Sequence, residues 1–387
     1  MQSIEFPDFS FSSPLAGTII DLERMRGDLG GGTTHPAVFL QLKSLFQLMA
    51  SIMSARIEGN RTSIVDAVEG AATYTGMGDS TAAEGVKEIV QLQEAAALID
   101  QVVEPGSPIT HGLVRELHKI AVLGLKREGD RTPGAYRTTD VTIGGSAHTP
   151  PSPVAVQGDM SELLDFVNRP VERSYDLLKV AIAHHRFVWI HPFGNGNGRV
   201  CRLFTYAIMV SQGFTDTTKY RAVNPTTVFG ADRSLYYRML EDADSLKPDA
   251  IIRWCQYLLE GMLNDLQKLN RLSDGSFVLD RLLRPAIKRG VDAGAYSIRD
   301  ASALDIVARL TEVRASDLES AIPGSIPVRS QHIRRLVDKR LIQPVAEGKR
   351  SYRLVMAPGP LTPFIIRQLD ELGFLPSILQ DNFGGIP

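Results

Sequence analysis

The chain has 387 residues, of which 43% are hydrophobic and 22% charged, and its formal net charge is −2. This composition is that of a globular protein with two or three domains, and it excludes a disordered or fibrous chain. Two cysteines cannot build a disulfide framework, and the first residues lack the basic and apolar regions of a secretory signal. No run of about 18 apolar residues occurs. We therefore expect a cytoplasmic protein without a membrane-spanning segment.

The net charge is unevenly distributed along the chain. Residues 276–355 contain 15 Lys and Arg against 9 Asp and Glu, a net charge of +6, which leaves −8 for the remainder. A basic segment attached to an acidic body is a weak indication of nucleic-acid contact.

The N-terminal part predicts an arm followed by a long helix. Residues 1–35 are rich in Ser, Pro and Gly, and we expect one short helix near residues 19–25. Apolar residues then recur at helical spacing from residue 37 to residue 57, which predicts an amphipathic helix ending at Gly59, a favourable C-terminal cap. Its expected apolar face consists of Phe39, Leu42, Leu45, Phe46, Met49, Ile52 and Met53.

Three further helical segments follow, near residues 84–103, 110–121 and 158–168. Between the last two, residues 134–153 combine alternating β-branched residues, a Gly144-Gly145 pair and a proline-rich exit. This pattern predicts a β-hairpin, although an ordinary surface loop would have a similar composition.

The most informative stretch is residues 191–199, His-Pro-Phe-Gly-Asn-Gly-Asn-Gly-Arg, followed by Arg202. It lies between two apolar helical patterns, and so it reads as helix, tight glycine loop, helix. Glycines allow backbone N–H groups to approach an anion, and the N-terminus of the second helix favours negative charge. Arg199 and Arg202 share one helix face, and the ordinary pKa of His191 suits a general base. The stretch predicts a phosphate site with a base beside it; a glycine turn between core helices is the plainer alternative.

Towards the C-terminus, residues 232–244 and 248–272 predict helices, and the pattern then changes. Short helices near 304–310 and 315–321, a basic helix at 330–340 and a strand, turn, strand at 341–355 form the order of a winged helix. The basic helix carries Arg334, Arg335 and Arg340. A helix of this kind reads DNA in many winged helices, but such domains also dock proteins, and both interpretations stay open.

The stretch HPFGNGNGRVCR resembles the signature of Fic-domain enzymes, H-P-F-x-(D/E)-G-N-G-R-x-x-R. Only Asn195 departs from it, because the family has an acidic residue there. The preceding segment SARIEGN, residues 54–60, resembles the family's inhibitory motif, (S/T)-x-x-x-E-(G/N). The Tyr236-Tyr237 pair resembles one that the family places around adenine, although Asp244 stands where an Asn often follows. The resemblance covers roughly residues 10–272.

This resemblance implies transfer of AMP from ATP to a hydroxyl group of a target protein held along the flap, or of the enzyme itself. His191 would be the catalytic base. Arg199 would hold the β-phosphate and Arg202 the γ-phosphate. Ser54 and Glu58 would form the inhibitory pair that blocks Arg202. The full set of nucleotide-binding residues would be Asn195, Gly196, Asn197, Gly198, Arg199, Val200, Cys201, Arg202, Ile143, Gly144, Gly145, Tyr236 and Tyr237.

The metal is the uncertain part of this site. The family's carboxylate holds Mg²⁺, which prefers charged oxygen ligands, whereas Asn195 would offer a neutral amide oxygen as the metal ligand. We expect an active but slowed adenylyltransferase. Two alternatives remain: a winged-helix transcription regulator that senses nucleotide, and a catalytically weakened Fic module that only binds.

The expected fold is mainly α: a Fic-type helical core with a β-hairpin flap, and a small winged-helix-like α+β domain. We place the N-terminal arm and inhibitory helix in residues 1–110, the core with its flap in 111–272, and the winged-helix-like domain and tail in 273–387. The expected partners are ATP and a target protein, with DNA contact and a homodimer left open.

Overall fold

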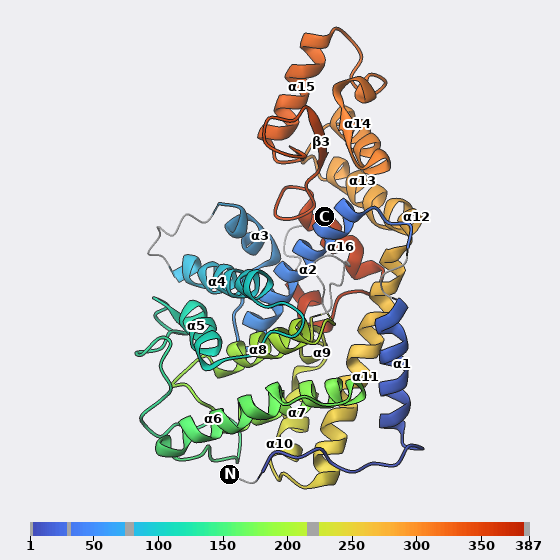
Figure 1. The fold of residues 1–387 in the computed structure, drawn as a ribbon. Helices are drawn as coiled ribbons and strands as arrows, with labels where there is room; N and C mark the ends of the chain where they lie inside the picture. Colours follow the sequence, from blue (N-terminus) through green and yellow to red (C-terminus); the bar gives the residue numbers. More distant parts are fainter. Residues whose placement is uncertain (1–2, 29–31, 74–80, 215–223, 383–387) are drawn as a thin grey trace.

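The apolar periodicities of the sequence become helices in a computed structural model, which describes residues 3–28, 32–73, 81–214 and 224–382 (Figure 1). The helices of the main body are α1 (Pro14–Asp28), α2 (Pro36–Ile57), α3 (Ile64–Thr73), α4 (Thr81–Val102), α5 (His111–Val122), α6 (Pro153–Asn168), α7 (Asp176–Ile190), α8 (Asn197–Ser211), α9 (Thr226–Ala231), α10 (Arg233–Ala243) and α11 (Pro248–Asn270). Helices α3 and α9 were not expected from the sequence.

The C-terminal part adds shorter elements. They are α12 (Gly275–Phe277), a π-helical turn (Val278–Leu283), α13 (Arg284–Asp292), α14 (Ile298–Leu310), β1 (Val313–Arg314), α15 (Ile326–Asp338), β2 (Ile342–Pro344), β3 (Ser351–Leu354) and α16 (Thr362–Glu371). Short 3-10 helices occupy Arg173–Tyr175, Arg271–Ser273, Ala315–Leu318 and Ser377–Asn382.

Helix α2 lies in the middle of the main body (Figure 1). Pro36 opens it, a position where the missing N–H costs nothing, and every residue from Leu48 to Ile57 is buried. The predicted amphipathic pattern therefore holds only for its first half, because α4, α8 and α9 surround the second half. Among the described helices, α2 alone is long and apolar enough to cross a membrane by length and composition, and 61% of that window is buried, as in the core helix of a globular fold.

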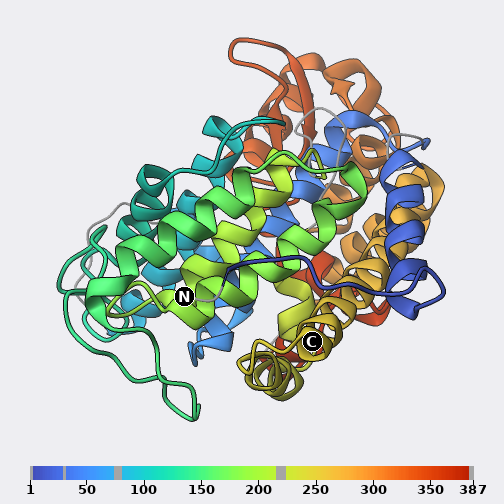
Figure 2. The same ribbon diagram turned by 60° about the horizontal axis from the view of Figure 1, so that its bottom comes forward.

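The N-terminal arm is better ordered than its composition suggests. Its helix is longer than predicted and packs along α11, as Figure 1 shows. The segment before α1 crosses the main body in Figure 2, and its own Ile4 side chain is buried. There the Phe6 ring lies 5.1 Å from the Phe166 ring and 4.9 Å from the Tyr175 ring. Aromatic contacts of this kind help to compensate for the entropy lost on ordering the arm.

The C-terminal lobe contains a three-stranded antiparallel sheet in the order β1-β3-β2. Val313 pairs with Tyr352, and Ile342 pairs with Leu354. Along the chain the lobe consists of α14, β1, a 3-10 helix, α15 and the β2–β3 hairpin. Helix α15 includes residues 330–338 of the predicted basic helix. In Figure 1 this lobe stands at the end of the main body away from α10.

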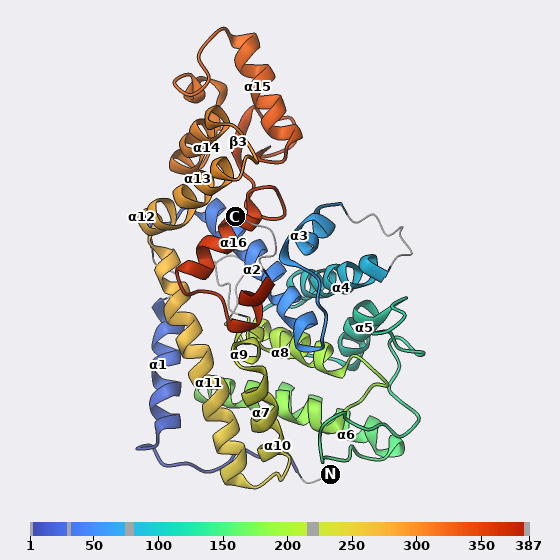
Figure 3. The same ribbon diagram turned by 180° about the vertical axis from the view of Figure 1, so that it is seen from behind.

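The tail after the sheet returns to the main body, which the sequence did not indicate. Figure 3 shows α16 and the following segment lying between α2 and α11. The Arg56 guanidinium donates to the Ile378 carbonyl at 2.9 Å, and the Ser377 hydroxyl donates to the Ala231 carbonyl at 2.7 Å. Both ends of the C-terminal lobe are therefore attached to the body.

The predicted β-hairpin at residues 134–153 is wrong. A turn does form at its tip, where Ser146 N–H donates to the Ile143 carbonyl at 3.2 Å and Gly145 adopts a φ of +77°. No strand forms in this segment, which we call the flap loop. Its carbonyls at both ends are instead bonded by the Arg137 side chain, and proline removes ladder donors at Pro150 and Pro151.

Candidate functional site

The glycine stretch forms the loop between α7 and α8, at the wall of a pocket of about 660 Å³. His191 ends α7 in the left-handed conformation with φ 52° and ψ 61°, and Gly196 precedes α8 with a φ of +76°. These two positive φ values turn the chain sharply, so that the N-terminus of α8 faces the pocket. Among the described residues, the N–H groups of Asn197, Gly198 and Arg199 have no acceptor, which leaves them available to an anion.

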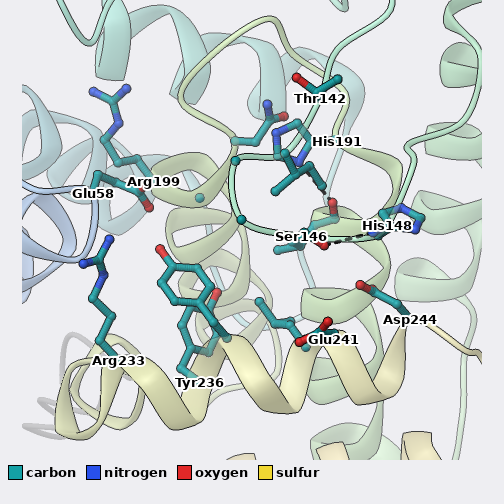
Figure 4. Close-up of a pocket in the computed structure, with 18 of the residues that line it drawn as sticks. Glu58, Thr142, Ser146, His148, His191, Arg199, Arg233, Tyr236, Glu241 and Asp244 are labelled. Atoms are coloured by element: carbon teal, nitrogen blue, oxygen red, sulfur yellow. Dashed lines mark hydrogen bonds between the residues drawn. The ribbon is translucent and has the colours of Figure 1, made fainter.

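The pocket collects residues from distant parts of the chain (Figure 4). Helix α10 and the residue after it contribute one wall, and the flap loop and His191 lie opposite. Figure 4 labels Arg233, Tyr236, Glu241 and Asp244 on the first side and Thr142, Ser146, His148 and His191 on the second. The predicted residues that line the pocket are Ile143, Gly144, Gly145, His191, Asn195, Gly196, Asn197, Gly198, Arg199, Arg202, Tyr236, Tyr237 and Glu58.

His191 is oriented for proton abstraction. Its Nδ1 lies 3.2 Å from the Val188 carbonyl oxygen, which can only accept, so Nδ1 carries the proton and Nε2 keeps its lone pair. Burial lowers the pKa of His191 to about 4; the bond to Val188 opposes this shift, and the Arg137 charge adds to it. The imidazole is therefore neutral, the form that a general base requires.

Arg202 is bound by the end of α2, as the inhibitory motif predicted. Its Nε donates to the Ser54 hydroxyl at 2.8 Å, and its Nη2 donates to the Ser54 carbonyl at 2.9 Å and to Glu58 Oε1 at 2.8 Å. The guanidinium is 2% exposed, whereas the Glu58 side chain is 28% exposed. Burial alone would lower the pKa of Arg202, but the Glu58 carboxylate raises it above its ordinary value.

Gly198 provides the space for this ion pair. A Cβ at position 198 would lie 2.3 Å from Glu58 Oε1 and 3.3 Å from Arg202 Nη1. The Glu58 carboxylate therefore rests on the first turn of α8, where the unpaired N–H groups favour negative charge.

Arg199 is arranged differently from the expectation that it holds a phosphate. Its guanidinium is 1% exposed, donates to Glu88 Oε1 at 3.2 Å and to the Glu128 carbonyl at 2.7 Å, and lies 3.5 Å from Glu128 Oε2. Burial raises the pKa of Glu88, although the Arg199 charge opposes that rise. Asn60, two residues after Glu58, donates to the other Glu88 oxygen at 2.8 Å. In this conformation the Arg199 guanidinium connects α8 to Glu88 and Glu128.

Val200 and Cys201, two of the residues predicted to bind nucleotide, do not line the pocket. Both are fully buried, and the Cys201 thiol donates to the His184 carbonyl at 3.2 Å. A helix advances about 100° per residue, so the two positions after Arg199 turn into the core while Arg202 returns to the pocket side.

The two Asn side chains of the loop stabilise its shape. Asn197 bonds to both the N–H and the carbonyl of Phe193, each at 2.9 Å. Asn195 Oδ1 accepts from Gly196 N–H at 2.7 Å, and its Nδ2 donates to the Gly129 carbonyl at 3.1 Å. The only metal ligand expected from the sequence is thus a neutral oxygen that is already engaged.

These residues do not fit a metal ion held by the protein. Mg²⁺ prefers charged oxygen ligands, and the described residues contain no cluster of three or more His, Cys, Asp or Glu side chains suited to a metal. We therefore derive no step through a metal ion.

Two residues that the sequence analysis did not identify contact and stabilise the loop between α7 and α8. Asp130 accepts from the N–H groups of Asn195 and Thr132, both at 2.8 Å. His118 stacks on the Phe193 ring at 3.7 Å, accepts from Gly134 N–H at 2.9 Å and lies 3.2 Å from the Asn195 carbonyl. Burial lowers the pKa of His118 to about 4, so it is a neutral brace. Neither residue belongs to a recognisable local motif.

Tyr236 and Tyr237 have unequal positions at the other end of the pocket. Tyr236 is buried, with its hydroxyl 3.0 Å from His184 Nε2, while Tyr237 is 41% exposed. Asp244 Oδ1 lies 3.1 Å from His185 Nε2, which fixes the carboxylate at the pocket edge. These residues offer an aromatic wall and an acceptor, features suited to a nucleobase.

The fold and site together define a helical protein in which the glycine loop before α8 and a buried, neutral histidine line one pocket. Residues 108–209 match the family model described as Fic/DOC family, so this segment is similar to a Fic domain. Over 159 residues it is 30% identical to the protein adenylyltransferase Fic of Nematostella vectensis, covering 41% of this chain and 34% of that relative. Over 87 residues it is 36% identical to a probable protein adenylyltransferase of Aquifex aeolicus, covering 22% of this chain and 27% of the relative.

The chain thus spans about a third of the length of these curated relatives or less. Among solved structures, a Fic family protein from Desulfovibrio desulfuricans aligns with a TM-score of 0.56 at 18% identity, covering 91% of this chain and 98% of that one. A Fic-domain signalling protein from Bacteroides thetaiotaomicron aligns with a TM-score of 0.51 at 17% identity, covering 66% and 96%. These alignments show that the helical fold is shared.

Proposed function

We propose that this chain transfers AMP from ATP to a Ser, Thr or Tyr hydroxyl of a target protein or of itself. The observation that carries the proposal is the meeting of two features in one pocket: the unpaired N–H groups of α8 and the free Nε2 of His191. The similarity to proteins named protein adenylyltransferase supports the same activity.

In the proposed reaction His191 accepts the proton of the target hydroxyl. The oxygen forms a bond to the α-phosphorus of ATP, the bond to the bridging oxygen breaks, and pyrophosphate leaves. The α8 N–H groups stabilise the phosphate charge, since such chemistry depends on positioning and charge neutralisation. Arg202 takes part only after Glu58 withdraws from it.

Mass spectrometry tests the proposal directly. The Glu58→Gly protein, incubated with ATP and magnesium, is expected to gain the mass of one or more AMP groups on hydroxyl side chains. The Glu58→Gly, His191→Ala protein is expected to gain none. A mass gain corresponding to phosphate, or no gain in a folded protein that binds ATP, would contradict adenylyl transfer.

We propose that Asn195 weakens the use of Mg²⁺ that accompanies ATP. Asn195→Asp cannot donate to the Gly129 carbonyl, and repulsion from Asp130 should direct the new carboxylate towards the pocket. Changes at metal sites alter affinity by roughly 10–100-fold. We therefore expect the magnesium concentration for half-maximal activity to fall by a similar factor. An unchanged magnesium titration would show that position 195 does not contact the metal.

A second candidate function is DNA binding by the C-terminal lobe. The specific observation is that Arg334 and Arg335 are exposed on α15, with Lys349 and Arg350 exposed on the β2–β3 turn. Arg340, which the sequence had placed on the reading face, instead donates to the Ala72 carbonyl of α3. This arrangement would suit a helix in the major groove with a basic wing beside it.

The double change Arg334→Ala, Arg335→Ala is expected to weaken DNA binding at moderate salt. The slope of the logarithm of DNA affinity against the logarithm of salt concentration should fall in magnitude by about one for each DNA phosphate that the protein no longer neutralises. Arg340→Ala is the matched control and should leave the affinity unchanged. Gel shifts with the promoter of the protein's own gene and with unrelated DNA duplexes measure the affinity of both variants. No binding by the unmodified chain would favour protein docking by this lobe.

We also propose a cytoplasmic setting. Cys201 and Cys255 are both free and buried. Burial raises the pKa of each thiol, so both stay protonated and unreactive. Such thiols are compatible with a reducing compartment.

A further inference from the structure

Arg137 stands at the start of the flap loop and is 4% exposed. No carboxylate forms an ion pair with it among the described residues; its donors go to main-chain carbonyls. Nε donates to the His191 carbonyl at 2.8 Å. The Nη groups donate to Thr139 at 3.2 Å, Pro151 at 2.5 Å and Ile190 at 3.3 Å. Its backbone N–H also donates to the Pro192 carbonyl at 2.9 Å.

These acceptors belong to two structures that the proposed reaction must bring together. Ile190 and His191 form the C-terminal end of α7, where carbonyls are unpaired and a cation is favourable. Thr139 and Pro151 lie near the two ends of the flap loop. One planar guanidinium therefore connects the backbone of the base to both ends of the flap loop.

The backbone of His191 needs such support. A residue other than glycine is strained in the left-handed region, and it persists there only when its surroundings hold it. The bond from Arg137 Nε fixes the His191 carbonyl, and the bond from Nδ1 to Val188 fixes the ring. Together they direct Nε2 into the pocket.

We propose that Arg137 is a positioning residue that sets the distance and angle between the flap loop and the His191 base. This inference rests on the proposed adenylyl transfer, in which a protein hydroxyl lying along the flap loop meets Nε2. Arg137 touches neither nucleotide nor target in this role. Lysine cannot replace it, because an ammonium is a point donor and cannot span carbonyls in four directions as a planar fork does.

The test compares two acceptors in the Glu58→Gly protein. One is the protein's own hydroxyl groups, measured as AMP incorporation. The other is water, measured as AMP release from ATP, which needs His191 but no flap-bound segment. We expect Arg137→Lys to lower incorporation by about 10²-fold, the effect of roughly 1 Å of misplacement, and to lower AMP release much less. Nucleotide affinity should stay within about twofold.

Arg115→Lys is the matched control. Arg115 lies in the same region, with its guanidinium 4.5 Å above the Tyr136 ring and bonded to the Gln157 side chain rather than to the His191 or flap-loop carbonyls. It should leave the ratio of incorporation to release unchanged. If Arg137→Lys lowers both rates in proportion, or neither, Arg137 is only a structural residue and the inference is wrong.

A second readout separates charge from geometry. The charged or titratable groups that act on the His191 pKa are Arg137, Glu58 and His148. Arg137→Gln removes a positive charge that lowers the His191 pKa, so the acid limb of the water reaction should move to higher pH. Arg137→Lys keeps the charge and should leave that limb in place. If the acid limb of the pH profile lies at the same pH in both variants, Arg137 does not act on the His191 pKa through its charge.

Hydrogen exchange provides a readout without activity. In Arg137→Lys, amides of residues 138–152 should exchange faster, whereas those of α8 should not change. Unchanged exchange in the flap loop would overturn the inference even in an inactive protein. If the Glu58→Gly parent neither incorporates nor releases AMP, the proposed function fails by itself, and exchange still decides whether Arg137 holds the flap loop.

Discussion

His191→Ala is expected to abolish AMP transfer while leaving the fold and ATP binding nearly intact. His191 lines the pocket and is the proposed base, and loss of a general base lowers rates by about 10²–10⁴-fold. Alanine has the same backbone as histidine, including the carbonyl that accepts from Arg137. The left-handed turn at position 191 can therefore persist. Initial rates of AMP incorporation, measured in the Glu58→Gly background, give the effect.

His148→Ala is a useful control for this variant. His148 also lines the pocket, but its Nε2 lies 2.8 Å from the Trp189 carbonyl, which occupies that nitrogen. We expect a much smaller loss from this change. If His191→Ala incorporates AMP as fast as its parent, the base has been wrongly assigned.

The same assignment predicts a pH profile. A general base acts in its neutral form, and burial lowers the pKa of His191 to about 4. The rate should therefore stay level as pH falls through about 6.5, where an ordinary histidine titrates, and should decline only towards pH 4. A half-maximal rate near pH 6.5 would show that bound nucleotide or an opened site restores an ordinary histidine.

Glu58→Gly is expected to raise auto-modification by about 10²-fold while changing ATP affinity less. Glu58 occupies the Arg202 guanidinium at 2.8 Å and lies against Gly198 at the start of α8. With Arg202 taken, the γ-phosphate of ATP has to shift, and a shift of about 1 Å at the reacting phosphorus can cost roughly 10²-fold in rate. Removing the carboxylate frees Arg202 for the phosphate.

Two variants separate release of Arg202 from fraying of the helix end. Glu58→Gln keeps the shape of the side chain but removes its charge, and it should activate to an intermediate level. Ser54→Ala loses the hydroxyl bond to Arg202 yet keeps the carbonyl bond, so it should activate more weakly still. A Glu58→Gly rate at or below that of the unmodified chain, in a folded protein, would disprove the inhibitory pair.

Much of this site could be predicted because its signals are local. The 3.6-residue periodicity located the long helix α2, and the glycine spacing located the α7–α8 loop. The pairing of Glu58 with Arg202 followed from the inhibitory motif's resemblance, and the structure places the two side chains in contact.

The failures have other causes. Glu88 lies 111 residues before Arg199, and nothing near Arg199 indicates a buried carboxylate waiting for it. The flap loop has the local propensity of a hairpin, but Arg137 bonds the carbonyls that strand pairing would have used. Val200 and Cys201 were assigned by their place in the motif, whereas helix geometry turns them into the core. A partner distant in sequence thus decided the first position, a side chain within the segment the second, and the geometry of the helix the third.

The most direct measurement uses ATP labelled either on the α-phosphate or on the γ-phosphate. The Glu58→Gly chain is incubated with each in turn, beside the same chain carrying His191→Ala. Adenylyl transfer predicts that only the α label becomes covalently attached, that pyrophosphate is released in equal amount, and that the His191→Ala chain stays unlabelled. Attachment of the γ label, or attachment of the α label that persists without His191, would contradict the account.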